Sequence, residues 1–189
     1  MKNLVLTKNN FMNYLDPATG NPIPREWDIV IPEVVVDKNG NEYQIVAIGD
    51  DVFAGCENLT FITIPDGVTE IGFSAFADCK NLTSITIPDS VTEIGGYAFS
   101  DCESLTTITI PDSVTEIGCY AFYGCSNLTT ITIPDSVTYI GYDTFVDCSD
   151  DLVITYRGHD YTLGNLYMLS KQSDGLDILV CMNIMNDAA

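Results

Sequence analysis

Apolar and polar positions along this chain recur at a fixed interval of 23 residues. In five successive units, the same positions hold isoleucine, glycine, phenylalanine and cysteine. Repeats of about 20–45 residues are typical of solenoids, in which each unit packs only against its neighbours. The pattern therefore predicts five stacked coils around one continuous core. The columns are Ile48, Ile71, Ile94, Ile117 and Ile140; Gly49, Gly72, Gly95, Gly118 and Gly141; Phe53, Phe76, Phe99, Phe122 and Phe145; and Cys56, Cys79, Cys102, Cys125 and Cys148.

The first half of one coil can be predicted from the unit at residues 81–102. Residues 84–87 read Ser-Ile-Thr-Ile. This alternation of polar and apolar side chains indicates a short, half-buried strand. Pro88 ends the strand because proline has no N–H to donate to a neighbour. Residues 88–90 suit a type I turn, with the proline at its first central position.

The second half of the unit is predicted to lead into the next coil. Residues 91–94 form a second extended segment with its apolar side chains inward, and residues 96–100 form one short helical turn that buries the phenylalanine. The position before each cysteine holds only glycine or aspartate, which indicates a left-handed backbone that closes this turn. That column is Gly55, Asp78, Asp101, Gly124 and Asp147.

Stacking these units aligns identical side chains and pairs successive strands in parallel, about 4.8 Å apart. We therefore predict a mainly β, right-handed solenoid of 23-residue units. It has a parallel sheet on one face, short helical turns opposite, and caps that contain hairpins.

The seven cysteines are an odd number, which does not suit a simple disulfide framework. Five of them form the cysteine column, which we interpret as a buried ladder of small apolar side chains. Parallel side chains one coil apart are poorly placed for disulfides. No Cys-x-x-Cys pair is present and the single His159 has no cysteine nearby, which argues against zinc. Cys119 lies outside the ladder, and we expect it to be exposed.

The repeated unit resembles the BspA-type leucine-rich repeat, whose treponemal-type pattern is LxxIxIPxxVxxIGxxAFxxC. The match is position for position over residues 82–102 and 105–125, and looser over residues 59–79 and 128–148. The resemblance covers about residues 27–165. It implies a leucine-rich-repeat solenoid, a role in extracellular adhesion or protein recognition, and no catalytic residues.

The flanking segments are expected to close the solenoid, because a terminal coil would otherwise expose its core to water. Residues 28–32 look like a first strand, and residues 38–43 like a hairpin with an Asn-Gly turn. Residues 155–161 look like a closing hairpin. We expect an N-terminal capping segment over residues 1–26, the solenoid over residues 27–156 and a C-terminal cap over residues 157–189.

Apolar residues outside the repeat are candidates for covering its two ends. Leu176 to Cys181 fit either a strand or a helical turn. The other candidates are Phe11, Tyr14, Leu15 and Ile23 at the N-terminal end, and Leu166, Tyr167, Met168 and Leu169, which suit a short amphipathic helix, at the C-terminal end.

The composition excludes several classes of function. The 189 residues include 27 acidic and 7 basic side chains, for a formal net charge of -20, yet 46% are hydrophobic. The chain is too apolar for an acidic disordered tail, and too acidic to bind nucleic acid or an anionic lipid surface. Residues 46–151 contain 17 acidic residues and one basic residue, Lys80. Ten of these acids lie in three repeated columns, so the charge by itself does not indicate a basic partner.

The acidic columns are also a candidate calcium site, because calcium binds rows of carboxylate oxygens. We favour solvated turns instead, since the Gly-Asp alternation of calcium-binding repeats is absent. We therefore expect no metal and no other cofactor, and a melting temperature that is the same in calcium and in chelator. The columns are Asp66, Asp89, Asp112 and Asp135, and Glu70, Glu93 and Glu116.

Neither end of the chain contains a clear targeting segment. The apolar run at residues 4–6 is shorter than the roughly seven residues of a signal-peptide core, and no run reaches the roughly 18 residues of a membrane helix. We expect no direct membrane insertion. The resemblance suggests a secreted or cell-surface location, whereas the missing signal peptide leaves a cytoplasmic location open.

We find no catalytic constellation in the sequence. A Ser/His/Asp or Cys/His site would need His159, the only histidine. It follows Gly158 in a predicted capping turn, and no motif links it to an activated nucleophile. We predict that the protein is not an enzyme.

Candidate binding residues are the outward positions of the strands, which flank the inward isoleucines and line the usual recognition face of such solenoids. A second interpretation is that threonine is present only because β-branched residues suit strands. The regular threonine array also resembles ice-binding solenoids, although imperfectly, and a lack of thermal hysteresis activity would exclude that function. Tyrosines that break the pattern in the last coils, Tyr120 and Tyr123 among them, either anchor a partner or pack against the C-terminal cap. The candidate residues are Phe61, Thr63, Ser84, Thr86, Thr107, Thr109, Thr130, Thr132, Tyr139 and Tyr142.

Together, these features predict a monomeric, non-enzymatic module that binds a protein partner through the solenoid sheet, in bacterial surface adhesion or host-protein recognition. The identity of the partner does not follow from the sequence. The alternative is an intracellular structural or scaffold repeat protein, which free thiols would favour.

Overall fold

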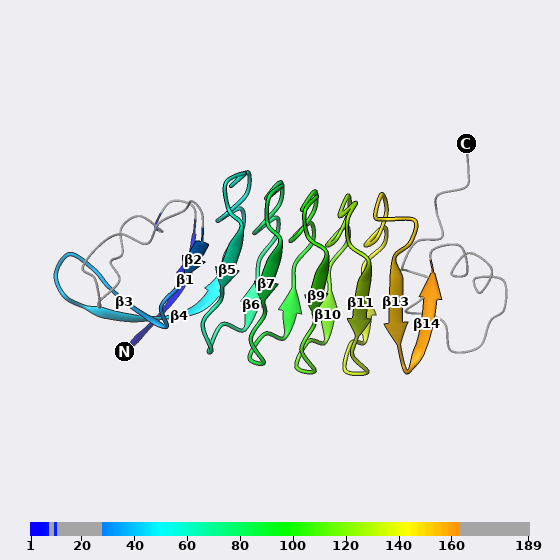
Figure 1. Cartoon of the computed structure of the whole chain (residues 1–189). Helices are drawn as coiled ribbons and strands as arrows, with labels where there is room; N and C mark the ends of the chain where they lie inside the picture. Colours follow the sequence, from blue (N-terminus) through cyan, green and yellow to red (C-terminus); the bar gives the residue numbers. More distant parts are fainter. Residues whose placement is uncertain (8–9, 11–27, 163–189) are drawn as a thin grey trace.

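The computed structural model describes residues 1–7, 10 and 28–162. In this part, short strands joined by tight turns stack coil upon coil, so the predicted solenoid is confirmed (Figure 1). The strands are β1 (Lys2–Leu6), β2 (Asp28–Val30), β3 (Val34–Val36), β4 (Glu42–Ile48), β5 (Phe61–Thr63), β6 (Glu70–Ile71), β7 (Ser84–Thr86), β8 (Glu93–Ile94), β9 (Thr107–Thr109), β10 (Glu116–Ile117), β11 (Thr130–Ile133), β12 (Tyr139–Ile140), β13 (Val153–Tyr156) and β14 (His159–Thr162).

The strands line two sides of the solenoid. On one side, β1, β4, β6, β8, β10 and β12 form a parallel sheet, with β3 antiparallel to β4. On the other side, β2, β5 and β7 form a second parallel sheet, and β9, β11 and β13 continue its line up to the antiparallel β14 (Figure 1). The mainly β prediction is confirmed with one difference. The second extended segment of each unit builds a parallel sheet of its own, where we predicted a sheet on one face only.

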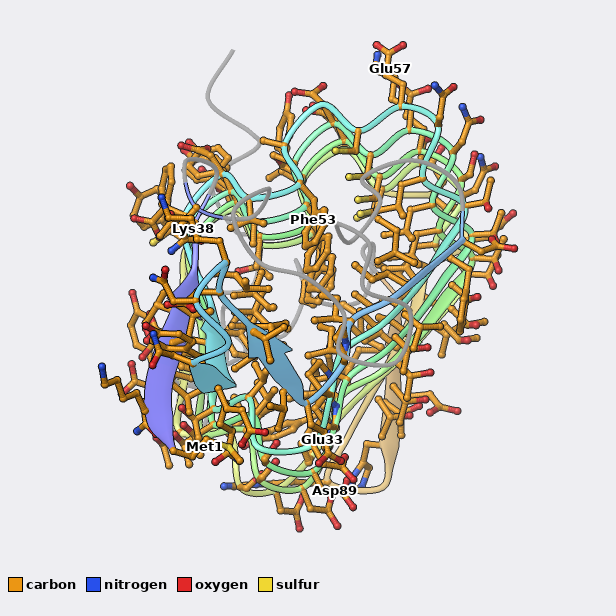
Figure 2. All side chains as sticks on the ribbon, turned by 90° about the vertical axis from the view of Figure 1, so that its left-hand side faces the viewer. Met1, Glu33, Lys38, Phe53, Glu57 and Asp89 are labelled. Carbon is orange, nitrogen blue, oxygen red and sulfur yellow. The ribbon has the colours of Figure 1, made fainter. Side chains whose placement is uncertain are left out.

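A file of phenylalanine rings occupies the centre of the solenoid, where Figure 2 labels Phe53. The five rings are fully buried. Neighbouring rings are nearly parallel, with interplanar angles of 2–7° and centroids 5.2–5.7 Å apart. Stacked aromatic pairs stabilise a core beyond the apolar area that they bury. The repeat of phenylalanine at 23 residues therefore produces the central column of the fold.

The turn after the first strand of each coil differs from the prediction in its register. In the coil at residues 84–94, the carbonyl oxygen of Pro88 accepts a hydrogen bond from the N–H of Val91 at 3.1 Å. Asp89 and Ser90 are therefore the central residues, and the prediction that proline takes the first central position is wrong. Ser90 uses its hydroxyl to donate to the carbonyl of Val68 in the previous coil, at 2.7 Å.

The segment that buries each phenylalanine is not helical, in contrast to the prediction of a short helical turn. Around Phe99, the φ angles of Tyr97 and Asp101 are 56° and 55°, which interrupts any run of right-handed helical residues. The N–H of Phe99 donates to the carbonyl of Ala121 in the next coil at 2.8 Å. Hydrogen bonds between coils thus alternate with single turns within the coil, such as the bond from the N–H of Ser100 to the carbonyl of Tyr97 at 3.1 Å, and no continuous helix forms.

Two columns of residues have a left-handed backbone. The predicted column, before each cysteine, is confirmed at all five positions, with φ angles between 55° and 71°. The second column lies four residues earlier and was not predicted, because its side chains differ from coil to coil. It consists of Asp51, Ser74, Tyr97, Tyr120 and Asp143.

Glycine and cysteine hold successive coils together. The N–H of Gly95 donates to the carbonyl of Ile71 at 2.7 Å, and a Cβ at this glycine would lie 2.7 Å from the carbonyl carbon of Gly72. The thiol of Cys102 donates to the carbonyl of Phe76 at 3.3 Å, and three other ladder cysteines repeat this bond at 3.1–3.2 Å. Cys79, Cys102, Cys119, Cys125 and Cys148 form no disulfide. The interpretation of the column as a buried ladder is confirmed for its three central members, while its two end members are half-buried.

Both predicted hairpins are present at the ends of the array. β3 and β4 are joined by a turn in which the Asp37 carboxylate accepts hydrogen bonds from the Asn41 side chain and from the N–H groups of Asn39 and Asn41. These bonds, the Asn41 side chain first, lower the pKa of Asp37 to about 2. β13 and β14 form the closing hairpin around Arg157 and Gly158.

Strand β1 adds one strand to the first sheet, beyond the first repeated unit. It pairs in parallel with β4 and places Leu6 beside Ile48, and the N–H of Gly49 donates to the carbonyl of Leu6 at 2.7 Å. This is the bond that Gly95 makes to Ile71 within the array. This strand was not predicted. The predicted capping contacts, at Phe11 to Ile23 and at residues 166–181, lie outside the described residues.

Candidate functional site

The first candidate surface, which we call the threonine face, consists of the outward side chains of β5, β7, β9 and β11. They form two columns in register between paired strands. Phe61 and Thr63 are half-buried, and the other six are exposed. The structure thus brings eight of the ten predicted site residues onto one surface: Phe61, Thr63, Ser84, Thr86, Thr107, Thr109, Thr130 and Thr132.

The hydroxyl groups distinguish this surface from the threonines elsewhere in each coil. Thr83 donates to the carbonyl of Thr60 at 3.0 Å and Thr92 to that of Thr69 at 3.2 Å, and four other threonines make the same link between coils. Within the part of the chain that the structure describes, no hydroxyl of the threonine face makes a hydrogen bond. The chain therefore uses one set of threonines to join its coils and presents the other set to solvent.

The second candidate surface is a file of aromatic side chains where the chain leaves the first sheet. Phe73 contacts Tyr97 with ring centroids 5.4 Å apart, and Tyr97 stacks on Tyr120 at 4.7 Å. Tyr120 in turn meets the edges of Tyr123 at 6.0 Å and Tyr142 at 5.2 Å. We call this surface the aromatic strip. With Tyr139, its members are Phe73, Tyr97, Tyr120, Tyr123, Tyr139 and Tyr142.

Tyr139 joins the aromatic strip from the glutamate column of the first sheet, where it pairs with Glu116. Its hydroxyl lies 3.8 Å from the Sγ atom of Cys119 in the previous coil, so the side chain leans towards the strip. Cys119 is half-buried, which modifies the expectation that it is exposed. Tyr139 and Tyr142, the remaining predicted site residues, therefore belong to the second surface and not to the threonine face.

Column-by-column reading of the sequence missed Phe73 and Tyr97. Phe73 and Tyr142 share a column with Gly96 and Cys119, whereas Tyr97 stands one position later in its unit. The two rings meet because Gly96 has no side chain there: a Cβ at this glycine would contact the Phe73 ring at 3.4 Å. The sequence signal for this contact was therefore Phe73 in the same column as Gly96 of the next coil, with Tyr97 directly after that glycine.

Carboxylates border the aromatic strip. The Asp143 carboxylate beside the Tyr120 hydroxyl raises the pKa of Tyr120 to about 12, and the Asp147 carboxylate raises the pKa of Tyr123. On the sheet side, partial burial and then repulsion from Glu70 and Glu116 raise the pKa of Glu93. In the column before the cysteines, partial burial and then repulsion from Asp78 raise the pKa of Asp101. The strip is thus a surface where negative charges are crowded.

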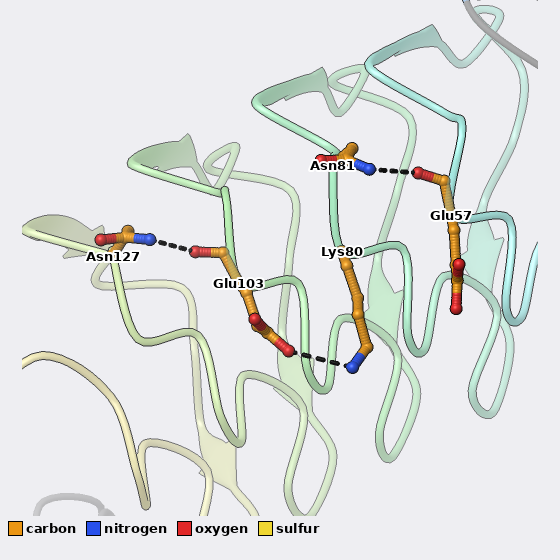
Figure 3. Close-up of polar contacts among 5 residues, drawn as sticks. All are labelled: Glu57, Lys80, Asn81, Glu103 and Asn127. Carbon is orange, nitrogen blue, oxygen red and sulfur yellow. Dashed lines mark hydrogen bonds and ion pairs between the residues drawn. The ribbon is translucent and has the colours of Figure 1, made fainter.

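Basic side chains are scarce on the array. Lys80, the only basic residue between residues 46 and 151, lies 3.1 Å from the carboxylate of Glu103 (Figure 3). This ion pair raises the pKa of Lys80. It lies on the loop that follows the cysteines, where Asn81 and Asn127 donate from their side chains to the carbonyls of Glu57 and Glu103 in the previous coils, at 2.7 and 2.6 Å. Figure 2 shows Glu57 and Asp89 at opposite ends of the cross-section.

We expect mild acidification to stabilise the array. A carboxyl group whose pKa is higher in the native state binds more protons there than in the unfolded chain, so stability increases as the pH falls through the native pKa values of Glu93 and Asp101. In low salt, the melting temperature should be about 2 °C higher at pH 5 than at pH 7.5. Because salt screens exposed charges, 0.5 M NaCl should reduce this difference. A melting temperature that falls between pH 7.5 and pH 5 would contradict the prediction.

Two glutamate variants separate crowding from net charge. E93Q removes a crowded charge and should raise the melting temperature at pH 7.5, whereas E103Q breaks the pair with Lys80 and should lower it slightly. Both remove one negative charge. Exposed ion pairs contribute about 0.2–1 kcal/mol, so both effects are small but opposite in sign. Equal shifts in the two variants would mean that only net charge matters.

The remaining candidates for chemistry are placed as follows. Burial raises the pKa of the Cys79 and Cys148 thiols to about 12, and raises the pKa of Cys102 and Cys125 well above the usual value. His159 is exposed at the start of β14, with Nδ1 2.9 Å from the carbonyl oxygen of Arg157.

Two further searches concern metals and membranes. Among residues 1–7, 10 and 28–162, no group of three His, Cys, Asp or Glu side chains is arranged to hold a metal ion. The same residues contain no apolar helix of membrane-spanning length.

Comparisons with known proteins agree with the repeat pattern. A family model described as the BspA type leucine rich repeat region matches residues 45–163 in six copies. A leucine-rich repeat protein from Bacteroides ovatus is 42% identical over 69% of this chain and 33% of its own, with a TM-score of 0.64. The Treponema pallidum leucine-rich repeat protein is 31% identical over 78% of this chain and 70% of its own, with a TM-score of 0.65.

A third solved structure, a leucine-rich repeat protein from Eubacterium ventriosum, is 31% identical over 71% of this chain and 33% of its own, with a TM-score of 0.56. The chain therefore spans about a third of the length of the Bacteroides and Eubacterium proteins. A comparison with curated proteins found no match.

Proposed function

Because the chain belongs to the BspA-type leucine-rich repeat family, we propose that it is a non-enzymatic protein-binding module. Its role is bacterial surface adhesion or host-protein recognition, and its binding surface is the threonine face. The observation that carries this proposal is that two sets of threonine hydroxyls differ in their hydrogen bonding. One set joins coils, as Thr83 does with Thr60, while the other projects hydroxyls that bond no described residue.

The scaffold beneath the threonine face suits recognition of a partner. Its strands are fixed by pairing to the neighbouring coils and by the fully buried phenylalanines behind them. A pre-organised surface loses little conformational entropy on binding, so its contacts contribute fully to affinity. Repeats of this family are generally non-catalytic, and the only histidine is exposed, with its Nδ1 at a backbone carbonyl.

The intracellular scaffold remains the alternative role, and the thiols do not decide between the two. Four of the ladder thiols, those of Cys79, Cys102, Cys125 and Cys148, form no disulfide, as expected in a reducing compartment. However, they also donate to backbone carbonyls of the previous coil, and burial raises their pKa. Since thiol–disulfide exchange needs an accessible thiolate, the same ladder would stay reduced in an oxidising compartment.

The threonine face can be tested by truncating its hydroxyls. In biolayer interferometry against purified host extracellular-matrix and epithelial surface proteins, we expect saturable binding to at least one of them. The triple variant T86A/T109A/T132A should weaken it at least tenfold, since each lost hydrogen bond contributes about 0.5–1.5 kcal/mol.

The matched control is T69A/T92A/T115A, which removes three hydroxyls that join coils. It should lower the melting temperature without changing affinity. Equal affinities for the parent and T86A/T109A/T132A would exclude the threonine face. Absence of binding to every host protein would favour the intracellular alternative.

A further inference from the structure

The exposed apolar side chains of the array gather in two places. Six large apolar side chains are exposed in the described part of the chain. Val5 and Val30 belong to β1 and β2 near the N-terminal end and Met1 directly precedes β1, while the other three belong to the aromatic strip. Of these, Phe73 is 51%, Tyr139 48% and Tyr142 56% exposed. Exposed aromatic clusters of this kind are common at protein interfaces.

The aromatic strip runs along the axis of the solenoid and is continuous. Its rings touch from Phe73 through Tyr97 and Tyr120 to Tyr142, across four successive coils. With about 4.8 Å per coil, this file is about 14 Å long, which matches about four residues of an extended chain. An extended segment lying along the axis could therefore contact every ring of the file.

The charges around the aromatic strip select the chemistry of such a segment. Glu70, Glu93 and Glu116 border it along the sheet, and the carboxylates of Asp143 and Asp147 lie beside the hydroxyls of Tyr120 and Tyr123. Residues 46–151 offer no free basic side chain to neutralise them, because their single lysine, Lys80, is paired on another loop. A second copy of this chain, with its net charge of -20, would be repelled, as would nucleic acid and anionic membrane.

We propose that the aromatic strip is the docking surface for an arginine- or lysine-rich segment of a protein partner. This inference rests on the proposed protein-binding function and adds the chemistry of the partner. The cationic groups pair with the bordering carboxylates, guanidinium planes lie against the outward aromatic surfaces, and aliphatic stems cover the ring edges. Neither the carboxylates nor the rings alone define the site, because acidic columns also occur in the turns after the prolines, as at Asp89 and Asp112.

The test uses a fluorescein-labelled peptide of six alternating arginine and serine residues, titrated with the full chain in 0.15 M NaCl and followed by fluorescence anisotropy. A peptide with glutamate in place of arginine is the charge control. Y139S/Y142S keeps the net charge of the protein, so unspecific attraction to the peptide is unchanged. We expect it to weaken arginine-peptide binding at least tenfold. The matched control F61S removes an aromatic ring from the threonine face and should stay within twofold of the parent.

A second readout uses the parent protein and does not depend on a variant. Cys119 lies beside Tyr139 in the aromatic strip, and its alkylation by iodoacetamide can be followed by peptide mass spectrometry. Bound arginine peptide should slow this alkylation at least threefold, while the glutamate peptide should leave it unchanged. If Y139S/Y142S loses its fold, this footprint still tests the proposal.

The outcomes separate this inference from the proposed function. No arginine-peptide binding, equal affinity for the parent and Y139S/Y142S, or an unprotected Cys119 would overturn the role of the strip. In those cases, binding of a host protein through the threonine face could still stand. Conversely, strip-dependent peptide binding without any host-protein binding would support the strip and contradict the host-recognition role.

Discussion

Replacing Phe99 by alanine should lower the free energy of unfolding by about 3–5 kcal/mol, as for other buried phenylalanines. Phe99 is the middle ring of the column, fully buried between Phe76 at 5.4 Å and Phe122 at 5.5 Å. Its removal leaves a cavity that rigid, paired coils cannot fill by collapse. Both adjacent coil interfaces lose a stacked ring, and in a solenoid these interfaces supply much of the stability. Urea unfolding followed by circular dichroism measures the effect.

The matched control is Phe73, the same residue type at an exposed position. F73A truncates a ring that is 51% exposed and packs on Tyr97 from one side. It should cost less than about 1 kcal/mol, since little apolar area returns to water. If F99A and F73A destabilised the protein equally, the phenylalanine column would not be the core that the structure describes.

The second large effect is expected from G95A, which adds one methyl group. The new Cβ would lie 2.7 Å from the carbonyl carbon and 2.9 Å from the carbonyl oxygen of Gly72 in the previous coil. These are backbone atoms, so the coils themselves must separate. The hydrogen bond from Gly95 to Ile71, at 2.7 Å, is then strained. We expect a loss of about 3 kcal/mol, at the upper end of what overpacking usually costs. Urea unfolding provides the measurement.

The neighbouring glycine is the control for backbone flexibility. G96A is the same substitution one residue later, where Phe73, Cys119 and Tyr142 occupy the equivalent position in other coils. Its nearest contact is the carbonyl oxygen of Cys119 at 3.2 Å, which a small shift relieves. The change in stability should stay within about 1 kcal/mol, because alanine also restricts the unfolded chain. Similar losses in G95A and G96A would show that the close approach of coils is not the reason for the glycine column.

The fold was predictable from the sequence where one backbone requirement recurs in every coil. Asp78 and Gly124 could be assigned a left-handed conformation because only aspartate and glycine appear before the cysteines, and both tolerate it. The same conformation at Tyr97 and Tyr120 could not be predicted, since tyrosine rarely adopts it. Those residues are held there by bonds between coils, such as Tyr97 N–H to the carbonyl of Cys119 at 2.9 Å. Tertiary contacts thus override local preference.

The candidate surfaces were predictable to a different extent. The threonine face follows from alternation along each strand, which fixes which side chains point outward. Which hydroxyls remain unused depends on coil-to-coil distances, and the sequence does not contain these. The aromatic strip was found only in part. Tyr139 and Tyr142 break their columns, but Phe73 joins the strip through a sideways contact with Tyr97 that no column displays.

Strand β1 has a consequence for the alignment of the coils during folding. Because every unit offers nearly the same columns, a coil that paired with the wrong neighbour would still match isoleucine to isoleucine, and such slips are weakly penalised. β1 lies outside the 23-residue spacing, and its Leu6 fits beside Ile48 through a bond to Gly49. If one coil were skipped in the stacking, either β1 would lose its pairing with β4 or the closing hairpin would lose its pairing with β11. The two non-repeating ends therefore fix the register in which the coils pair and the number of coils in the folded array, because the repeated units between them are too similar to do so.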